Sequence, residues 1–237
     1  MARFLRFIFA VAALPFCAAL AMALWCAVME SAVRGMADGI PAGGIAFCAG
    51  FLVFFALSLA LPAPARAYVL GHEITHAIWG LAFGAKVSNI KVGASGGYVT
   101  LSKSNVWITL APYFFPFYTA VVAVVALVWS LFKRPLPCLP AWLFAVGFTW
   151  SFHVCLTLRA LSQKQPDVLE YGRLFSWSFI WIANALGVMA VLCIATDMTF
   201  AQAAALLCDR AAFTYTAVWK AVSGIIHAAS TALGIGT

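Results

Sequence analysis

Acidic residues are scarce in this chain. Asp and Glu together account for 7 of 237 residues, and charged residues of both signs for only 9%. A soluble domain carries about 25% charged residues, so the composition excludes a soluble globular protein. Apolar residues make up 65% of the chain, and the mean hydropathy is +1.01. We therefore expect an all-α integral membrane protein, a multi-pass bundle of transmembrane helices forming one domain over residues 1–237 in the lipid bilayer of the cell (inner) membrane.

The shortage of acids also explains the net charge of +7. The basic residues lie at the ends of apolar runs, where lipid headgroups meet them, so they do not indicate a nucleic-acid partner. Closely paired cysteines are missing as well, because the seven cysteines show no C-x-x-C spacing and mostly fall in apolar runs. They indicate neither a disulfide framework nor a cysteine metal site.

Long apolar runs dominate the chain instead. The runs long enough to cross about 30 Å of hydrocarbon are Phe7–Val28, Gly44–Leu61, Ala67–Ala85, Val106–Phe132, Leu136–Leu158 and Leu174–Ile194. A seventh, Ala211–Gly236, could span or lie in the membrane interface. The first run is too long for the apolar region of a signal peptide, so we expect it to be a retained helix. The pattern predicts six or seven transmembrane helices.

Residues Lys86–Lys103 differ from these runs. Short β-prone pieces alternate there with polar residues and surround the pair Gly96-Gly97. This pattern predicts a small membrane-associated β-hairpin over residues 86–103. An ordinary extramembrane loop is the alternative.

Two prolines, Pro112 and Pro116, interrupt the fourth run. Proline within a span leaves backbone carbonyls that neighbouring groups or a water-filled cavity must satisfy. The interruption is either a kink for helix packing or a break that lines a substrate path.

The main functional signal is His72-Glu73-Ile74-Thr75-His76. In a helix over residues 67–85, the two histidines are four residues apart and project from one face, so both can bind one Zn²⁺. Glu73 can act as general base on water at such a site. An ionisable residue in a membrane helix costs about 3 kcal/mol, which favours a functional role. The alternative is a pair of buried histidines hydrogen-bonded to their neighbours.

A catalytic zinc site usually has three protein ligands, so one ligand remains to be found. Asp167 stands out because Pro166 fixes the backbone before it and an apolar run follows. A solvated loop carboxylate is the alternative role for Asp167. Glu170 would complete a His-His-Glu set, and His153 is an ionisable residue within the fifth run.

The distribution of charge does not set the orientation of a six-span arrangement. With a cytoplasmic N-terminus, the predicted loops carry seven Lys and Arg on each side of the membrane, so the positive-inside rule decides nothing. The same arrangement places Asp167 opposite the start of the His72 helix. Either a segment such as Lys86–Pro116 is re-entrant, or Asp167 dips toward the middle of the bilayer.

The chain resembles the site-2 protease family of intramembrane zinc metalloproteases. The similarity rests on Gly71–Ala77, Gly84 and Gly96-Gly97-Tyr98-Val99, with Asp167 downstream, and it is specific only from about Ala67 to Tyr98. In that family a membrane-associated hairpin follows the H-E-x-x-H helix, and an aspartate on a later helix completes the zinc site. The resemblance implies that His72, His76 and Asp167 bind zinc and that Glu73 is the catalytic base. Asp167 lies in Pro-Asp-Val, whereas the family has Leu-Asp-Gly.

This resemblance implies a membrane-embedded zinc metallopeptidase that hydrolyses peptide bonds in or near the bilayer, with a membrane protein or peptide as substrate. The alternative is a non-catalytic relative that binds membrane partners, or a metal-handling membrane protein. The intact motif favours the enzyme, because a binding protein has no need of Glu73. A transporter would be expected to have further intramembrane His and Asp residues, and only His153 is available.

Overall fold

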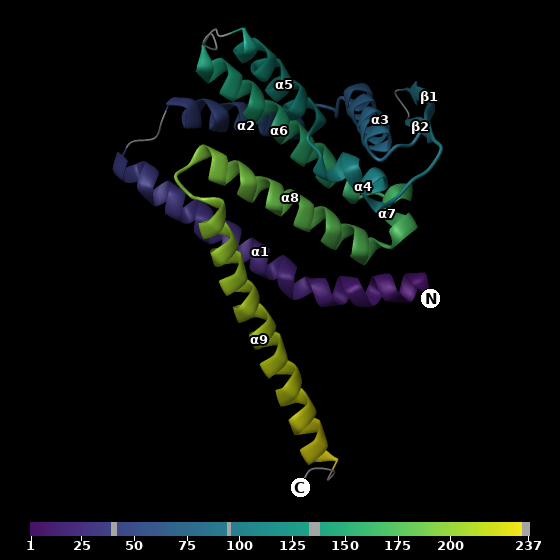
Figure 1. The fold of residues 1–237 in the computed structure, drawn as a ribbon, viewed down its shortest axis with the longest axis vertical. Coiled ribbons are helices and arrows are strands. Elements are labelled where there is room, and N and C mark those ends of the chain that lie inside the picture. Colours follow the sequence, from purple (N-terminus) through teal and green to yellow (C-terminus); the bar gives the residue numbers. More distant parts are fainter. Residues whose placement is uncertain (39–41, 94–95, 133–137, 234–237) are drawn as a thin grey trace. The chain divides into compact units, whose positions relative to one another are not determined.

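The computed structural model describes residues 1–38, 42–93, 96–132 and 138–233. Apart from one small antiparallel hairpin, its elements are helices, which confirms the predicted helical class and the presence of a hairpin (Figure 1). In chain order the elements are α1 (Ala2–Asp38), α2 (Ala42–Ala60), α3 (Ala65–Ala82), β1 (Val87–Val92), β2 (Gly97–Leu101), α4 (Val106–Phe114), α5 (Phe117–Leu131), α6 (Leu139–Leu161), α7 (Pro166–Tyr171), α8 (Arg173–Ala195) and α9 (Phe200–Ala232). They form two compact units, Met1–Ala37 with Gly172–Thr237, and Asp38–Tyr171.

The first unit consists of α1, α8 and α9, which pack through small side chains. Ala23 and Ala27 of α1 are fully buried, and they cluster with Met189 of α8 and Ala203 of α9. Small residues let helices approach closely, which is how helices associate in lipid.

The last helix begins earlier than its apolar run. The Thr199 hydroxyl accepts from the Gln202 backbone N–H, and the Gln202 side chain accepts from the Thr199 backbone N–H. This capping box satisfies free N–H groups of the first turn. It fixes the start of α9 at Phe200, so the predicted run Ala211–Gly236 corresponds to the later part of a longer helix, apart from its last residues, which lie outside the described chain.

The second unit is built on α2 and α6, which cross with almost no space between their backbones. A Cβ atom at Gly50 would overlap the carbonyl oxygen of Phe144, and one at Gly147 would overlap the carbonyl oxygen of Phe47. Each glycine thus lies three residues after a phenylalanine whose carbonyl faces the glycine of the other helix. This repeated Phe-x-x-Gly pattern allows the crossing, because only glycine lets the two main chains meet.

Contacts along α2 and α6 show that the two helices run in the same direction. Near their starts, Gly43 faces the side chain of Leu143. Near their ends, Arg159 of α6 donates a hydrogen bond to the carbonyl oxygen of Ser58 in α2. The end of α2, where α3 follows, and the end of α6, where α7 follows, therefore lie together.

The segment between α2 and α5, which contains α3, the hairpin and α4, begins and ends at this same end of α2 and α6. The Tyr118 hydroxyl at the start of α5 donates to the carbonyl of Ala67 at the start of α3, at 2.6 Å. α5 then packs along α6, where the Thr119 hydroxyl donates to that of Thr149 at 3.1 Å. Figure 1 shows α3, the hairpin, α4 and α7 gathered at one end of α2 and α6. A re-entrant segment, as considered from the sequence, stays a prediction, because the bent pair α4–α5 fits a broken span as well as a re-entrant loop.

The hairpin packs against α3. Its strands pair with Lys91 opposite Tyr98 and with Val92 opposite Gly97. Gly97 is required by close approach, since a Cβ atom there would lie 2.7 Å from Cγ1 of Val69 and 2.9 Å from Cγ of Glu73, both on α3.

The fourth apolar run is two helices rather than one. α4 and α5 meet at an angle of 80° across Phe115-Pro116. Phe115 is extended, with φ −100° and ψ 109°, because the ring of a following proline disfavours helical backbone at the preceding residue. Pro116 therefore ends one helix and begins the next.

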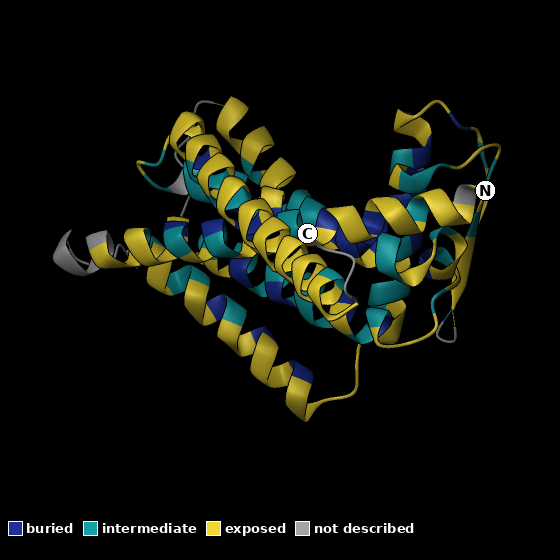
Figure 2. Cartoon of the chain, turned by 90° about the horizontal axis from the view of Figure 1, so that it is seen from below, coloured by how far each residue is buried: buried dark blue, intermediate teal, exposed yellow. Residues whose placement is uncertain are grey.

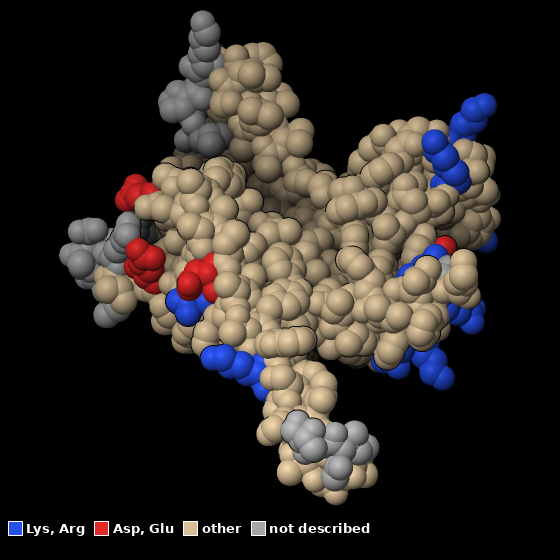
Figure 3. Space-filling view, turned by 60° about the horizontal axis from the view of Figure 1, so that its bottom comes forward, with Lys and Arg blue, Asp and Glu red and all other residues tan. Residues whose placement is uncertain are grey.

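Four helices of the described chain, α1, α2, α6 and α8, are long and apolar enough to cross a membrane, and the bent pair α4–α5 would make a fifth. α3 and α9 are not among them, so six or seven spans remain a prediction. The helices bury only narrow strips and expose most of their apolar side chains (Figure 2), and charged side chains are sparse on the face seen in Figure 3. Such surfaces agree with a membrane protein.

Candidate metal centre

The histidine pair lies on one face of α3, as its spacing predicts. α3 extends over Ala65–Ala82, a shift of two or three residues from the predicted 67–85. It ends where Gly84 adopts a left-handed conformation, with φ +72°, which glycine tolerates without a steric penalty. The Nε2 atoms of His72 and His76 are 3.2 Å apart.

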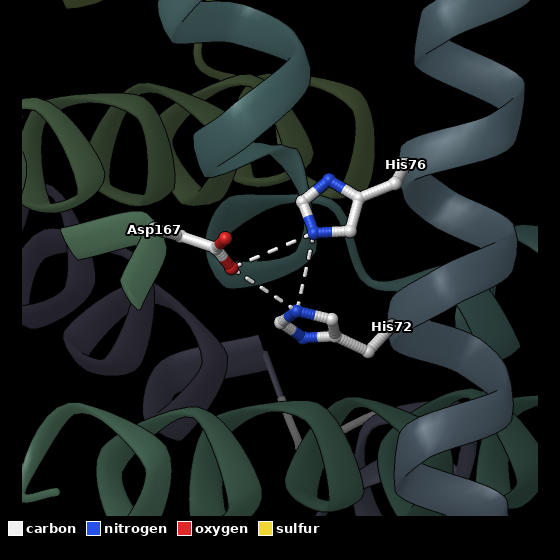
Figure 4. A group of neighbouring side chains, drawn as sticks. All are labelled: His72, His76 and Asp167. Atoms are coloured by element: carbon white, nitrogen blue, oxygen red, sulfur yellow. Dashed lines mark hydrogen bonds and ion pairs between the residues drawn. The ribbon is translucent and has the colours of Figure 1, made fainter. Parts of the chain in front are cut away.

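Asp167 comes from a separate element, the short helix α7 that follows α6. Pro166 begins α7, a position where its missing N–H costs nothing, and this places Asp167 in the first turn. Its Oδ2 atom is 3.2 Å from Nε2 of His72 and 3.5 Å from Nε2 of His76 (Figure 4). Within the described residues, His72, His76 and Asp167 are the only group of three such side chains that could hold a metal ion.

The three donor atoms have the spacing of a tetrahedral zinc site. Zinc bonds to nitrogen and oxygen are about 2.0–2.2 Å long, so tetrahedral angles place neighbouring donor atoms roughly 3.3–3.6 Å apart. The observed separations are 3.2, 3.2 and 3.5 Å. Three protein donors leave the fourth tetrahedral position open, as in catalytic zinc sites.

The tautomer of His76 is fixed by the main chain. Its Nδ1 atom is 2.9 Å from the carbonyl oxygen of Ile108 in α4, and because a carbonyl can only accept, Nδ1 carries the proton. In the neutral ring, Nε2 is then left with a free lone pair that faces the other two donor atoms. This is the usual arrangement of a metal-binding histidine.

The other ring nitrogen of His72 is buried, and the His72 side chain lines a small cavity. Nδ1 of His72 is buried and has no hydrogen-bond partner among the described residues. The cavity, of about 20 Å³, is lined in part by Tyr68, His72, Tyr118 and His153. It has room for about one water molecule.

The Asp167 carboxylate is adapted to remain ionised. Burial by itself would raise its pKa, but when the rings of His72 and His76 are protonated their hydrogen bonds and charge outweigh burial and hold the pKa of Asp167 well below its usual value. The side chain is 25% exposed. An ionised carboxylate is the form that binds a metal.

Glu73 lies beside the triangle and beneath the hairpin. It is 7% exposed, and its Cγ atom faces Gly97 of β2. Its carboxylate is close enough to His72, His76 and Asp167 to interact with them electrostatically. Glu73 therefore lies near both the three donor atoms and strand β2.

Of the three candidates for a third ligand, the structure brings Asp167 together with the two histidines. Glu170 is exposed on α7, His153 lines the same cavity as His72, and neither is part of the triangle. Two contacts were missed by sequence reasoning, the Ile108 carbonyl and the Tyr113 hydroxyl, which donates to Oδ2 of Asp167 at 3.0 Å. Pro112 was the signal in the sequence for the Ile108 contact. It lies four residues after Ile108 and has no N–H to bond the Ile108 carbonyl within the helix.

No protein-family model matches the chain, and no curated protein or solved structure gives a significant match. Function therefore has to be inferred from the residues of the centre.

Proposed function

We propose that the protein is a membrane-embedded zinc metallopeptidase that hydrolyses peptide bonds in or near the bilayer. The observation that carries this proposal is the triangle of His72, His76 and Asp167, which has tetrahedral spacing and a buried glutamate next to it. Three oxygen or nitrogen donors with an open fourth position are typical of catalytic rather than structural zinc.

Each side chain has a role in this chemistry. His72, His76 and Asp167 would hold the zinc, which supplies a Lewis acid that activates water and polarises a carbonyl. Glu73 accepts a proton from the attacking water and then passes it to the nitrogen of the departing amine. A carboxylate suits both steps because it can accept a proton and release it again. The burial of Glu73 beside the histidines keeps it close to the reacting groups and away from bulk solvent.

The hairpin offers a way to present the substrate. In the described chain β1 and β2 pair only with each other, so each strand has an outer edge with unpaired backbone groups. An extended peptide could add to such an edge by β-augmentation. This would unwind a helical membrane substrate beside Glu73 and expose its peptide bonds to attack.

The proposal is tested with purified protein reconstituted in liposomes together with single-span membrane peptides, and cleavage products are identified by mass spectrometry. Glu73→Gln should keep its zinc and lose about 10²–10⁴-fold in turnover, because the amide cannot accept a proton. Glu30→Gln, the same change on α1, is the matched control and should cleave normally. Normal cleavage by the Glu73→Gln variant, or no cleavage by the unchanged zinc-loaded protein, would refute the proposal.

A metal-handling membrane protein is the competing function. It would need a series of metal-binding side chains along a path, whereas the described residues form one such group. Zinc binding without any peptide cleavage would favour this competing function, or a non-catalytic relative.

A further inference from the structure

The helix α4 contacts the metal centre at two points. The α4 groups that make these contacts belong neither to the H-E-x-x-H motif nor to Asp167. Tyr113, which is fully buried, donates its hydroxyl proton to Oδ2 of Asp167 at 3.0 Å. Ile108, 1% exposed, accepts a hydrogen bond from Nδ1 of His76 at 2.9 Å. One short helix therefore contacts two of the three candidate ligands.

The Ile108 carbonyl is free to accept this bond because of Pro112. In an α-helix the carbonyl of residue i accepts from the N–H of residue i+4. Four residues after Ile108 stands Pro112, which has no N–H and whose ring crowds the carbonyl of residue i−4. The N–H of Ile108 is held as well, by the side-chain oxygen of Asn105 at 3.0 Å, so Ile108 is anchored through both its backbone groups.

The Tyr113 contact determines how Asp167 presents its oxygen. Oδ2 is the atom that lies 3.2 Å from His72 and 3.5 Å from His76, and it is the same atom that accepts from Tyr113. A carboxylate oxygen has two lone pairs. With one directed to the tyrosine hydroxyl, the other is left for the centre of the triangle.

We propose that α4 is the outer shell of the metal centre, in which Tyr113 orients Asp167 and the Ile108 carbonyl, released by Pro112, orients His76. The inference rests on the proposed metal site, and it makes Tyr113 and Pro112 positioning residues. Loss of such an outer contact typically weakens metal binding by about 10–100-fold.

The first test compares two tyrosines. Zinc affinity of the purified full-length protein is measured by competition with a chromophoric chelator for Tyr113→Phe and for Tyr118→Phe. Tyr113→Phe should bind zinc about 10–100-fold more weakly. Tyr118→Phe loses only a bond to the Ala67 carbonyl and should bind normally. Equal affinity of Tyr113→Phe and the unchanged protein would overturn the role of Tyr113.

The second test separates positioning from folding. Pro112→Ala restores an N–H that can bond Ile108 within α4, and it removes a residue that disfavours helix. A purely structural role predicts a more stable helix with zinc affinity unchanged or higher. Positioning predicts about tenfold weaker zinc binding, because the carbonyl is drawn back into the helix and away from His76. Unchanged or tighter binding would overturn the role of Pro112.

A spectroscopic measurement reports on the geometry of the site. With Co²⁺ in place of zinc, the visible absorption of Tyr113→Phe should change in position and intensity, whereas that of Tyr118→Phe should not. An identical spectrum for Tyr113→Phe and the unchanged protein would count against the outer shell. These readouts are independent of turnover. A protein that binds zinc but cleaves no peptide refutes the proposed peptidase function. A protein that cleaves peptides, and whose Tyr113→Phe and Pro112→Ala variants bind zinc with unchanged affinity, refutes this inference alone.

Discussion

Gly97→Ala tests whether the hairpin has to lie close against Glu73. The added Cβ atom would be 2.6 Å from the main-chain oxygen of Lys91, 2.7 Å from Cγ1 of Val69 and 2.9 Å from Cγ of Glu73. Ordinary contacts between carbon atoms are about 3.5–4.0 Å, so both carbon contacts are too short by about 0.6–1.3 Å. Because the obstacles lie on the partner strand and on α3, β2 has to move away from α3 by about 1 Å.

Two effects of this displacement can be estimated. Overpacking of this kind costs about 1–3 kcal/mol of stability, so the melting temperature should fall. Misplacement of a substrate-positioning element by about 1 Å can lower the rate by about 10²-fold. Zinc affinity should not change, since the three atoms nearest the new methyl group belong to neither histidine.

The assay measures cleavage of reconstituted membrane peptides by zinc-loaded Gly97→Ala, with chelator competition to determine its zinc affinity. Gly187→Ala is the matched control, because a Cβ atom there meets nothing within 4 Å. A Gly97→Ala variant that cleaves as fast as the control would show that the hairpin does not position substrate. Loss of zinc by that variant would equally contradict the reasoning.

Further predictions concern the ligands and the helix crossing. His76→Ala and Asp167→Ala should each lose most of the bound zinc by metal analysis, because two donors make an incomplete site. The control Asp209→Ala should retain its zinc. Full zinc occupancy in Asp167→Ala would remove Asp167 from the ligand set. Gly50→Ala should lower stability by about 3 kcal/mol in thermal unfolding, since the obstacle is a main-chain carbonyl that cannot rotate away. Gly187→Ala should unfold like the unchanged protein, and equal melting temperatures for the two variants would contradict the close crossing.

The sequence predicted the parts of the centre that depend on local geometry. Histidines four residues apart share a helix face whatever surrounds the helix, and a glycine pair between β-prone pieces forms a hairpin. Asp167 was a candidate third ligand because few donors exist and Pro166 precedes it, and the resemblance implied the same residue; the structure brings it to His72 across 95 residues of chain.

The outer contacts could not be predicted in the same way. A main-chain carbonyl carries no sequence signature of its own, and the bond from His76 to Ile108 depends on how α3 packs against α4. Tyr113 likewise resembles any buried aromatic residue until its partner is known. Only Pro112 signalled that a carbonyl of α4 would need a partner from outside its own helix.

The parallel pairing of α2 and α6 also bears on the orientation of the protein in the membrane. Suppose that α2 and α6 cross the membrane in the same direction and that α5, which precedes α6 in the chain, crosses in the opposite direction. Six basic residues of this unit then lie on the face where α2 and α6 end: Arg66, Lys86, Lys91, Lys103, Arg159 and Lys164. The described residues between Asp38 and Tyr171 include no other Lys or Arg. All the basic residues that the structure describes in this unit therefore share one face, and for this unit taken alone the positive-inside rule predicts that the face carrying the metal centre is cytoplasmic. A membrane-impermeant maleimide should accordingly label Cys138 from outside the cell and should reach a cysteine introduced at Ser162 only after permeabilisation; the reverse pattern would invert the assigned orientation.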